Sequence, residues 1–158
     1  MEDNPGFFPI FINLKGKTCI LYGGGEIAAR RAEGLLHFGA RVRVIAPRTG
    51  DGIERLKEEY PKSLQVEYAC YQKGIPEGDF VFSCTDDGKA DREIYQECKE
   101  RKIPVNIASD QSLCDFLFPA IAEGDGLVVG VSSGGRDHKK VRQFTRKLRE
   151  WMGGEKWK

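Results

Sequence analysis

The chain has 158 residues, of which 40% are hydrophobic and 31% are charged. That length suits one domain, or one domain with a small appendage, and that balance is typical of a soluble globular protein. The formal net charge is +1, so no overall field would recruit nucleic acid or an anionic membrane. The acidic N-terminus does not resemble a signal peptide, and no apolar stretch approaches the roughly 20 residues that span a bilayer. We therefore expect a cytoplasmic protein with no nucleic-acid and no membrane partner.

Strand-like and helix-like segments alternate between residues 17 and 108. The predicted strands cover residues 17–22, 41–46, 65–70, 79–85 and 104–108. The predicted helices cover residues 26–38, 53–60 and 89–102. Segment 79–85 is typical of a central parallel strand that is buried on both faces. Because the connections are short, this rhythm predicts an α/β fold with a Rossmann-like, doubly wound parallel sheet and right-handed crossovers.

The rhythm changes after residue 108. Two apolar stretches, 116–121 and 127–131, flank the turn Glu123-Gly124-Asp125-Gly126 and predict a β-hairpin, and residues 137–152 predict a strongly basic helix. An isolated hairpin is at best marginal in water, so we expect this one to pack on a second copy of the chain in a homodimer. The sequence thus predicts a Rossmann domain over 1–108 and a dimerisation region over 109–158.

The five cysteines form no Cys-x-x-Cys pair. Cys19, Cys70 and Cys84 stand in apolar, strand-like runs, where cysteine behaves as a small hydrophobic residue. We expect buried structural thiols in a reducing compartment rather than a metal site or a disulfide framework.

A glycine-rich turn joins the first predicted strand to the first predicted helix. The pattern Gly23-x-Gly25-x-x-Ala28 has the strand–turn–helix context of a dinucleotide fingerprint. Gly23 allows the tight turn, Gly25 lets the backbone approach a pyrophosphate, and the small Ala28 permits close packing of helix on strand. The pyrophosphate would lie on the free N–H groups and the positive dipole end of the helix that begins at Glu26. Glycines also occur in ordinary βα turns, but strand, turn, helix and second strand all follow in order here, so the sequence favours an NAD site.

The residues that would face the ribose leave the cofactor partly open. An acidic residue is expected about 20 residues beyond the glycine turn in an NAD site. The sequence has Ala46-Pro47-Arg48 there. Arg48 is suited to pair with a 2′-phosphate, and it is equally consistent with a solvated side chain. We expect NAD, with NADP not excluded.

Several further motifs occur in a recognisable order. They are residues 8–17, Gly23 to Ala32, Thr85-Asp86-Asp87, Asn106, residues 114–120 and Val131-Ser132-Ser133-Gly134-Gly135. In this order they resemble the precorrin-2 dehydrogenases, which are the N-terminal domains of siroheme synthases. The resemblance implies oxidation of precorrin-2 to sirohydrochlorin, with hydride passing to NAD, and a homodimer whose active site lies between the nucleotide domain and the hairpin region. Some members also insert iron to give siroheme.

The resemblance also implies roles for individual positions. The cofactor-binding set is Gly23, Gly24, Gly25, Glu26, Ile27, Ala28, Pro47, Arg48, Thr85 and Asp86. Within it, Glu26 and Ile27 would border the pyrophosphate, Pro47 and Arg48 the adenosine, and Thr85 and Asp86 the nicotinamide. The substrate-binding set is Asn106, Ser132, Ser133 and Gly134. An ordinary strand-to-helix connection with a capping serine is the alternative interpretation of the Ser-Ser-Gly-Gly segment.

One departure from the family concerns the catalytic carboxylate. The family usually carries an aspartate three residues after the Asn106 position, proposed as an acid/base or metal-binding group, whereas this sequence has Ser109 followed by Asp110. A carboxylate suits the reaction because hydride loss must be matched by proton removal. Serine cannot take that proton unless another base activates it, and a shift of one residue along a strand end reverses the side-chain direction. Ser109 and Asp110 are the candidate catalytic residues, and we name no metal ligand.

Further departures lie near the C-terminus. Arg136-Asp137-His138 replaces a small residue, serine and proline, and the chain stops at Lys158 where family members usually continue into a helical domain. The basic helix over 137–152 would either contact the carboxylates of a precorrin or present a solvated face. The main hypothesis is therefore an NAD-dependent precorrin-2 dehydrogenase, with ferrochelatase activity left open. The alternative is a catalytically impaired NAD- or tetrapyrrole-binding module that works with a partner enzyme.

Overall fold

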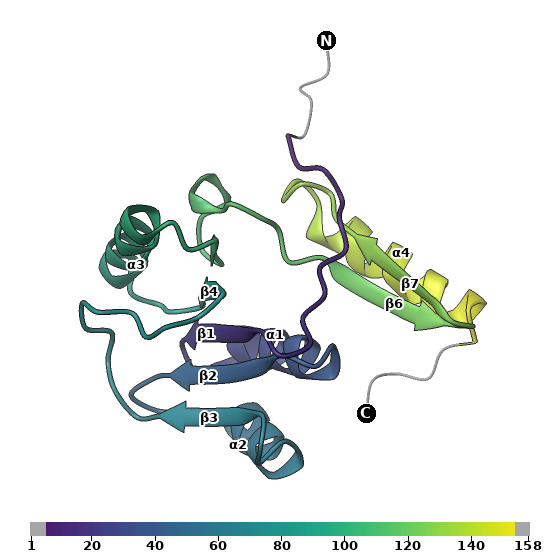
Figure 1. Ribbon diagram of the computed structural model, residues 1–158. Coiled ribbons are helices and arrows are strands. Elements are labelled where there is room, and N and C mark those ends of the chain that lie inside the picture. Colours follow the sequence, from purple (N-terminus) through teal and green to yellow (C-terminus); the bar gives the residue numbers. More distant parts are fainter. Residues whose placement is uncertain (1–5, 154–158) are drawn as a thin grey trace. The chain divides into compact units, whose positions relative to one another are not determined.

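The computed structural model describes residues 6–153 (Figure 1). The chain divides into two compact units. The sheet unit comprises residues 12–116, and the hairpin unit comprises residues 117–153 together with 6–11. None of the helices within residues 6–153 has the length and apolar character needed to cross a bilayer.

The sheet unit is built on five parallel strands. Their order is β3-β2-β1-β4-β5. The strands are β1 (Thr18–Tyr22), β2 (Arg41–Ile45), β3 (Leu64–Glu67), β4 (Phe80–Ser83) and β5 (Val105–Ile107). The helices are α1 (Glu26–His37), α2 (Asp51–Glu59) and α3 (Gly88–Arg101), with a short 3₁₀ turn η1 (Gln111–Leu113). From the central β1 the chain winds outward through β2 and β3 and then returns to β4 on the other side, which confirms the predicted doubly wound sheet.

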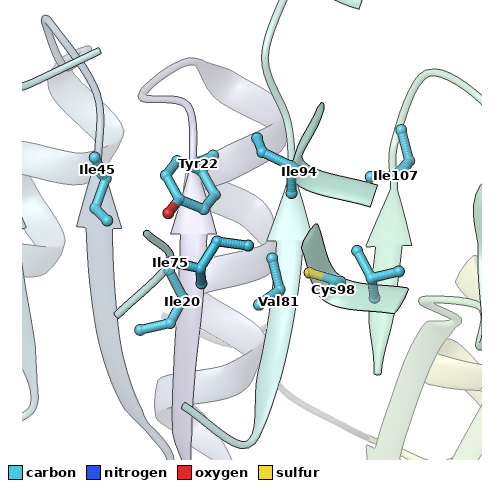
Figure 2. Packing of buried hydrophobic residues seen from close by; sticks show 9 residues of the cluster. Ile20, Tyr22, Ile45, Ile75, Val81, Ile94, Cys98 and Ile107 are labelled. Carbon is cyan, nitrogen blue, oxygen red and sulfur yellow. The ribbon is translucent and has the colours of Figure 1, made fainter. Parts of the chain in front are cut away.

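The core of the sheet unit lies around β1. Figure 2 shows Ile20 and Tyr22 of β1 between Ile45 of β2 and Val81 of β4. The full buried cluster draws on four strands, on α3 and on the β3–β4 connection: Ile20, Tyr22, Ile45, Ile75, Val81, Ile94, Cys98, Val105 and Ile107. Because β1 is buried along almost its whole length, its carboxyl end and the turn that follows are held by neighbours on both sides.

The cysteines follow the sequence prediction only in part. Cys19 is fully buried in β1, as predicted, and burial followed by the nearby Asp79 carboxylate raises the pKa of its thiol to about 12. Cys84 is half-buried, whereas Cys70 is exposed, so the prediction of a buried thiol at Cys70 is wrong. β3 ends at Glu67, three residues before Cys70, because the chain leaves the sheet there.

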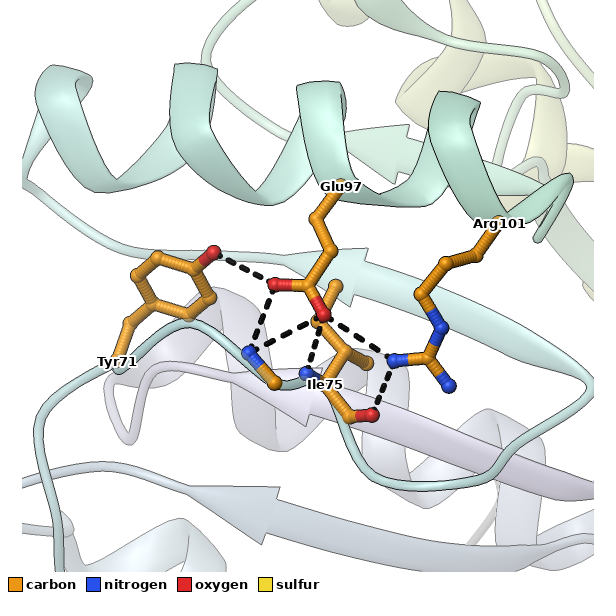
Figure 3. Close-up of polar contacts among 5 residues, drawn as sticks. Tyr71, Ile75, Glu97 and Arg101 are labelled. Carbon is orange, nitrogen blue, oxygen red and sulfur yellow. Dashed lines mark hydrogen bonds and ion pairs between the residues drawn. The ribbon is translucent and has the colours of Figure 1, made fainter.

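A buried carboxylate ties the β3–β4 connection to α3 (Figure 3). Glu97 is 5% exposed and accepts hydrogen bonds from the N–H groups of Gly74 (3.0 Å) and Ile75 (2.6 Å) and from the Tyr71 hydroxyl (2.9 Å). Arg101, one turn further along α3, forms an ion pair with it at 3.1 Å. Burial alone would raise the pKa of Glu97, but these hydrogen bonds outweigh it and lower the pKa. The long connection is therefore fixed against α3 by one side chain.

The hairpin unit consists of β6 (Ala120–Gly124), β7 (Leu127–Val131) and α4 (His138–Trp151). The antiparallel strands are joined by Asp125 and Gly126, both with positive φ (50° and 75°), which is the geometry that a two-residue Asp-Gly hairpin turn requires. The unit also supplies a partner for its own hairpin. α4 packs on β6, where an added Cβ on Gly124 would lie 2.5 Å from the Met152 carbonyl oxygen and the Arg149 Nε donates to the Ile121 carbonyl at 3.0 Å.

The predicted bounds of the first hairpin strand were wrong. Segment 116–119 is not part of β6, and Glu123 and Gly124, predicted as turn residues, pair with Val128 and Leu127 of β7. The apolar character of this segment has another cause, since the Phe116 ring packs edge-on against Phe80 and Phe82 of β4 at centroid distances of 5.8 and 5.4 Å. Phe116 is thus apolar because it packs on β4, and the strand begins only at Ala120.

Candidate cofactor and active site

The turn between β1 and α1 is pressed against the ends of both neighbouring strands. Gly23 has φ +108°, and a Cβ there would lie 2.4 Å from the carbonyl oxygen of Cys84, which follows β4. A Cβ on Gly24 would lie 2.3 Å from the carbonyl oxygen of Arg48, which follows β2. Both clashes are with backbone, so neither position accommodates a side chain. The β1–α1 turn can approach its neighbours this closely only because these residues are glycines.

Gly25 differs from the two glycines before it. A Cβ on Gly25 would meet no atom within 4 Å, so the space in front of α1 is open. Gly25 is also the N-cap of α1 and, like Gly50 at α2, offers no side-chain cap, whereas Asp87 and Asp137 cap α3 and α4. The N–H groups of the first turn and the positive helix dipole therefore face open space, which is the arrangement that binds a phosphate.

The two residues that follow Gly25 present different surfaces. Ile27 is 48% exposed although it is a large apolar residue, and Glu26 is also exposed. Ala28 is fully buried, which fits the close packing of α1 on the sheet that the sequence predicts. The uncapped amides, the open space at Gly25 and the exposed Ile27 fit the diphosphate of a dinucleotide.

The end of β2 lies beside the glycine turn. The Gly50 N–H donates to the Gly24 carbonyl at 2.9 Å, which fixes the β2–α2 connection against the turn. Within that connection Pro47 and Arg48 are exposed. The structure thus brings both predicted adenosine-side residues next to the predicted diphosphate cradle.

The end of β4 lies on the other side of the glycine turn and surrounds a buried carboxylate. Asp91, on the first turn of α3, is 3% exposed. Its carboxylate accepts hydrogen bonds from Ser83 Oγ at 2.6 Å, Thr85 Oγ1 at 2.7 Å and Ser109 Oγ at 2.5 Å. We call these four residues the carboxylate–hydroxyl cluster. It includes Thr85, a predicted nicotinamide-side residue, while Asp86 beside it is exposed.

Sequence reasoning missed Asp91. The prediction for residues 89–102 was a helix with no site residue. A signal was available, because Asp91 precedes Ile94 by three residues and Cys98 by seven, which is the spacing of one helix face. Ile94 and Cys98 are both fully buried. A carboxylate on the apolar face of α3 therefore indicated a buried acid.

The two candidate catalytic residues point to different partners. Ser109 is exposed, and its hydroxyl joins the cluster through Asp91. Asp110 instead caps η1, where its Oδ1 accepts hydrogen bonds from the Ser112 hydroxyl (2.7 Å) and the Ser112 N–H (2.9 Å), and these bonds lower its pKa. The structure brings Ser109, and not Asp110, into contact with Asp91.

Asn106 is a buried residue of β5. Its side-chain amide donates to the Phe116 carbonyl at 2.7 Å, and its Oδ1 accepts from Arg31 of α1 at 2.5 Å. Arg31 was not among the predicted site residues. The hydrogen bond between Arg31 and Asn106 therefore links α1 to the middle of β5.

The predicted Ser-Ser-Gly substrate segment belongs to the hairpin unit and forms the entry to α4. The Ser132 hydroxyl accepts from the Gly134 N–H at 3.0 Å, and the Ser133 hydroxyl accepts from the Asp137 N–H at 2.9 Å. Asp137 then caps α4 through the Lys140 N–H. Across residues 6–153 no group of three or more His, Cys, Asp or Glu side chains is arranged to hold a metal ion.

A doubly wound parallel sheet with an uncapped helix at a glycine turn defines a nucleotide-binding protein of the Rossmann type. The family model NAD_binding_7, for NAD(P)-binding domains, matches residues 10–120. The chain belongs to this family.

Curated relatives and one solved structure extend the comparison. The chain is 39% identical over 142 residues to siroheme synthase 1 of Halorhodospira halophila, a match that covers 89% of this chain and 29% of the relative. It is 35% identical over 147 residues to siroheme synthase of Pseudomonas fluorescens, covering 92% and 31%. The structure of SirC, precorrin-2 dehydrogenase, superposes with a TM-score of 0.75 at 25% identity over 91% of this chain and 70% of that one.

These matches confirm the predicted resemblance to the precorrin-2 dehydrogenase and siroheme synthase family. The chain spans about 30% of the length of these curated relatives.

Proposed function

We propose that this chain is a precorrin-2 dehydrogenase of siroheme biosynthesis, which oxidises precorrin-2 to sirohydrochlorin with NAD as hydride acceptor in the cytoplasm. The names of its relatives and its NAD(P)-binding family support this proposal. The observation that carries it is the uncapped first turn of α1, open at Gly25, beside the hydroxyl groups at the end of β4.

The strand order supports the proposed direction of the dinucleotide. β1 lies between β2 and β4, with Tyr22 opposite both Ile45 and Ser83. A diphosphate on the α1 amides would then have the β2 end, with Pro47 and Arg48, on its adenosine side. Thr85 and Asp86, after β4, would lie on its nicotinamide side. This placement agrees with the rule that ligands of doubly wound sheets bind at the carboxyl ends of the strands where the winding reverses.

The bound cofactor would supply a hydride acceptor. The protein would bind and orient the cofactor and the tetrapyrrole, and it would remove a proton from the tetrapyrrole. In this proposal Glu26 and Ile27 border the diphosphate, and Ala28 lets α1 pack close enough to present its amides. Asn106 supports the site by holding Arg31, and Ser132, Ser133 and Gly134 contact the tetrapyrrole. The candidates for removing a proton from the tetrapyrrole are Ser109 and Asp110.

The alternative function is a binding module without turnover, and the serine at position 109 favours it. A carboxylate at that position would accept a proton directly, whereas a serine needs a base behind it. The two functions differ in a single assay. Purified protein is mixed with precorrin-2 and NAD, and the absorbance of NADH and of sirohydrochlorin is followed. Appearance of both products supports the dehydrogenase, while tight NAD binding with neither product supports the module.

The proposed diphosphate site at the first turn of α1 is tested separately by substitutions at Gly25. Gly25→Asp fills the open space with a carboxylate that caps α1 and repels a diphosphate, so we expect the Kd for NAD to rise at least about tenfold, equivalent to roughly 1.4 kcal/mol. The melting temperature should stay equal or rise, because a capping aspartate stabilises a helix. Isothermal titration calorimetry and a thermal melt measure the two effects.

Two further variants separate charge from bulk at the same position. Gly25→Asn has the shape of aspartate without its charge, and Gly25→Ala adds only a methyl group. We expect affinity to fall in the order Ala, Asn, Asp. If all three variants bind NAD as the native chain does, the diphosphate does not lie on α1 and the proposed cofactor site is wrong.

A further inference from the structure

The carboxylate–hydroxyl cluster has an unusual composition for a buried acid. All three side-chain donors to Asp91 described above are hydroxyl groups, from Ser83, Thr85 and Ser109. Ser83 and Asp91 are buried, Thr85 is half-buried, and Ser109 is exposed. The carboxylate is therefore shielded from water itself but is connected to the surface by one hydroxyl.

A structural role for Asp91 explains only part of this arrangement. An acidic residue in the first turn of a helix is favoured by the helix dipole. However, Asp87 already caps α3 by accepting from the N–H groups of Lys89 and Ala90. Hydroxyl groups from the end of β4 and from the residues that follow β4 and β5 converge on Asp91 in addition. They do so at the edge of the sheet that holds the glycine turn.

The cluster places a carboxylate one hydrogen bond behind Ser109, the exposed candidate catalytic residue that follows β5. Asp91 Oδ2 accepts a hydrogen bond from Ser109 Oγ at 2.5 Å. Ser109 alone is a poor base, but a serine whose proton can pass to a carboxylate is not. We propose that Asp91 is the positioning residue that makes Ser109 the proton acceptor of this site.

The proposed step rests on the proposed dehydrogenase function. Oxidation of the tetrapyrrole removes one hydride, which passes to the nicotinamide, and one proton, whose bonding pair stays behind to form the new double bond. Ser109 Oγ accepts that proton while its own hydroxyl proton moves to Asp91 Oδ2. Ser109 is thereby unchanged and Asp91 becomes neutral until it loses the proton to water through the same hydroxyl. Ser83 and Thr85 hold the carboxylate in place.

We call the proposed proton transfer from the tetrapyrrole through Ser109 to Asp91 the relay. The first test compares two single variants, one at each of these two residues. Asp91→Asn keeps the shape of the side chain and removes its basicity, and Ser109→Ala removes the hydroxyl from an exposed loop position. We expect each to lower kcat at least about tenfold, within the range of acid–base catalysis, while KM for the tetrapyrrole and Kd for NAD stay within about twofold. Because the residues act as one unit, the double variant should be no slower than the slower single variant.

The second test moves the carboxylate. In the double variant Asp91→Asn with Ser109→Asp, the base stands at position 109 and an amide stands behind it, so we expect kcat to recover most of the loss of Asp91→Asn. Glu93→Gln is the matched control, because it neutralises an exposed carboxylate on the same helix and should leave kcat unchanged. If Asp91 only stabilises α3, Asp91→Asn will lower the melting temperature without lowering kcat, and Ser109→Asp will rescue nothing.

The outcomes separate this inference from the proposed function. A native chain that oxidises precorrin-2 together with equally fast Asp91→Asn and Ser109→Ala variants would overturn the relay and leave the dehydrogenase intact. A native chain without turnover would overturn the dehydrogenase, and the relay with it. If Asp91→Asn fails to fold, Ser109→Ala decides the matter, because its side chain is exposed.

Discussion

Three consecutive glycines in the β1–α1 turn are required for different reasons. Gly23 and Gly24 contact the backbone that follows β4 and β2, so packing alone excludes a side chain at either position. Gly25 has ordinary backbone angles and open space around it, so the fold would accept alanine there. In the proposed function, Gly25 leaves room for the diphosphate in front of α1. At the residue scale Gly25 is thus the more informative of the three.

We expect Arg48 to discriminate between the two nicotinamide cofactors. Its side chain is exposed beside the turn, where a 2′-phosphate would face it. We expect Arg48→Ala to raise the Kd for NADP about tenfold, because a charge-assisted hydrogen bond contributes roughly 1.5–3 kcal/mol. The Kd for NAD should change less than about twofold, since NAD carries no phosphate at that position. Calorimetry with both cofactors measures these dissociation constants. An equal loss of affinity for NAD and NADP would show that Arg48 does not contact the 2′-phosphate.

At the scale of elements, α3 carries two buried carboxylates with separate partners. Asp91, near its start, binds hydroxyl groups at the ends of β4 and β5, and Glu97, in its last two turns, binds the backbone of the β3–β4 connection. α3 therefore holds both Ser109, in the loop after β5, and the β3–β4 connection. Although this helix is rich in charged residues, Asp91 and Glu97 are buried.

Glu97→Gln is expected to destabilise the sheet unit in a pH-dependent manner. The lowered pKa of Glu97 means that its ionised form is stabilised by folding, so its contribution is present above the unfolded pKa of about 4.3 and is lost as the pH falls through the folded-state value. At neutral pH we expect the free energy of unfolding to fall by roughly 1–3 kcal/mol. Urea denaturation at neutral pH and at successively lower pH measures the difference.

The control for this prediction is Glu100→Gln, an exposed carboxylate on the same helix. We expect it to change the free energy of unfolding by less than about 0.5 kcal/mol at any pH. A loss at Glu97→Gln that is equally large at neutral and acid pH would contradict the role of its charge.

At the scale of the whole molecule, the hairpin unit exposes large apolar side chains. Leu127 on β7 is 55% exposed, and Phe144 and Trp151 on α4 are 53% and 79% exposed. Within the described residues β7 is an edge strand of a two-stranded sheet. Large exposed apolar side chains of this kind are typical of an interface. We propose that this surface joins two copies of the chain.

Light scattering on the full chain tests the proposed homodimer. We expect the native chain to have the mass of a dimer, and we expect Leu127→Glu and Phe144→Glu to raise the dimer dissociation constant at least about tenfold, because a buried charge in an interface core is costly. Lys62→Glu, an exposed change in the sheet unit, should leave the dimer intact. A native chain that stays monomeric at every accessible concentration would refute the proposal.

Local patterns determined much of the fold in advance. The parallel strands, the helices between them and the glycine turn at the first strand–helix junction were predicted, because each depends on residues that are near neighbours in the sequence. The errors arose where the role of an apolar residue depends on contacts with residues distant in the sequence, or where a strand ended earlier than its apolar run. Phe116 is apolar because it covers β4, not because it belongs to a strand, and Cys70 follows β3 instead of lying within it.

The sequence alone established the fold class, the family resemblance and the position of the glycine turn, since these are carried by spacing and residue type. Only the tertiary structure decided which groups meet. Ser109 and Asp91 are 18 residues apart, and Glu97 and Ile75 are 22 apart, and each pair forms through the register of α3 on the sheet. That register depends on the packing of the whole core, so no local pattern encodes it.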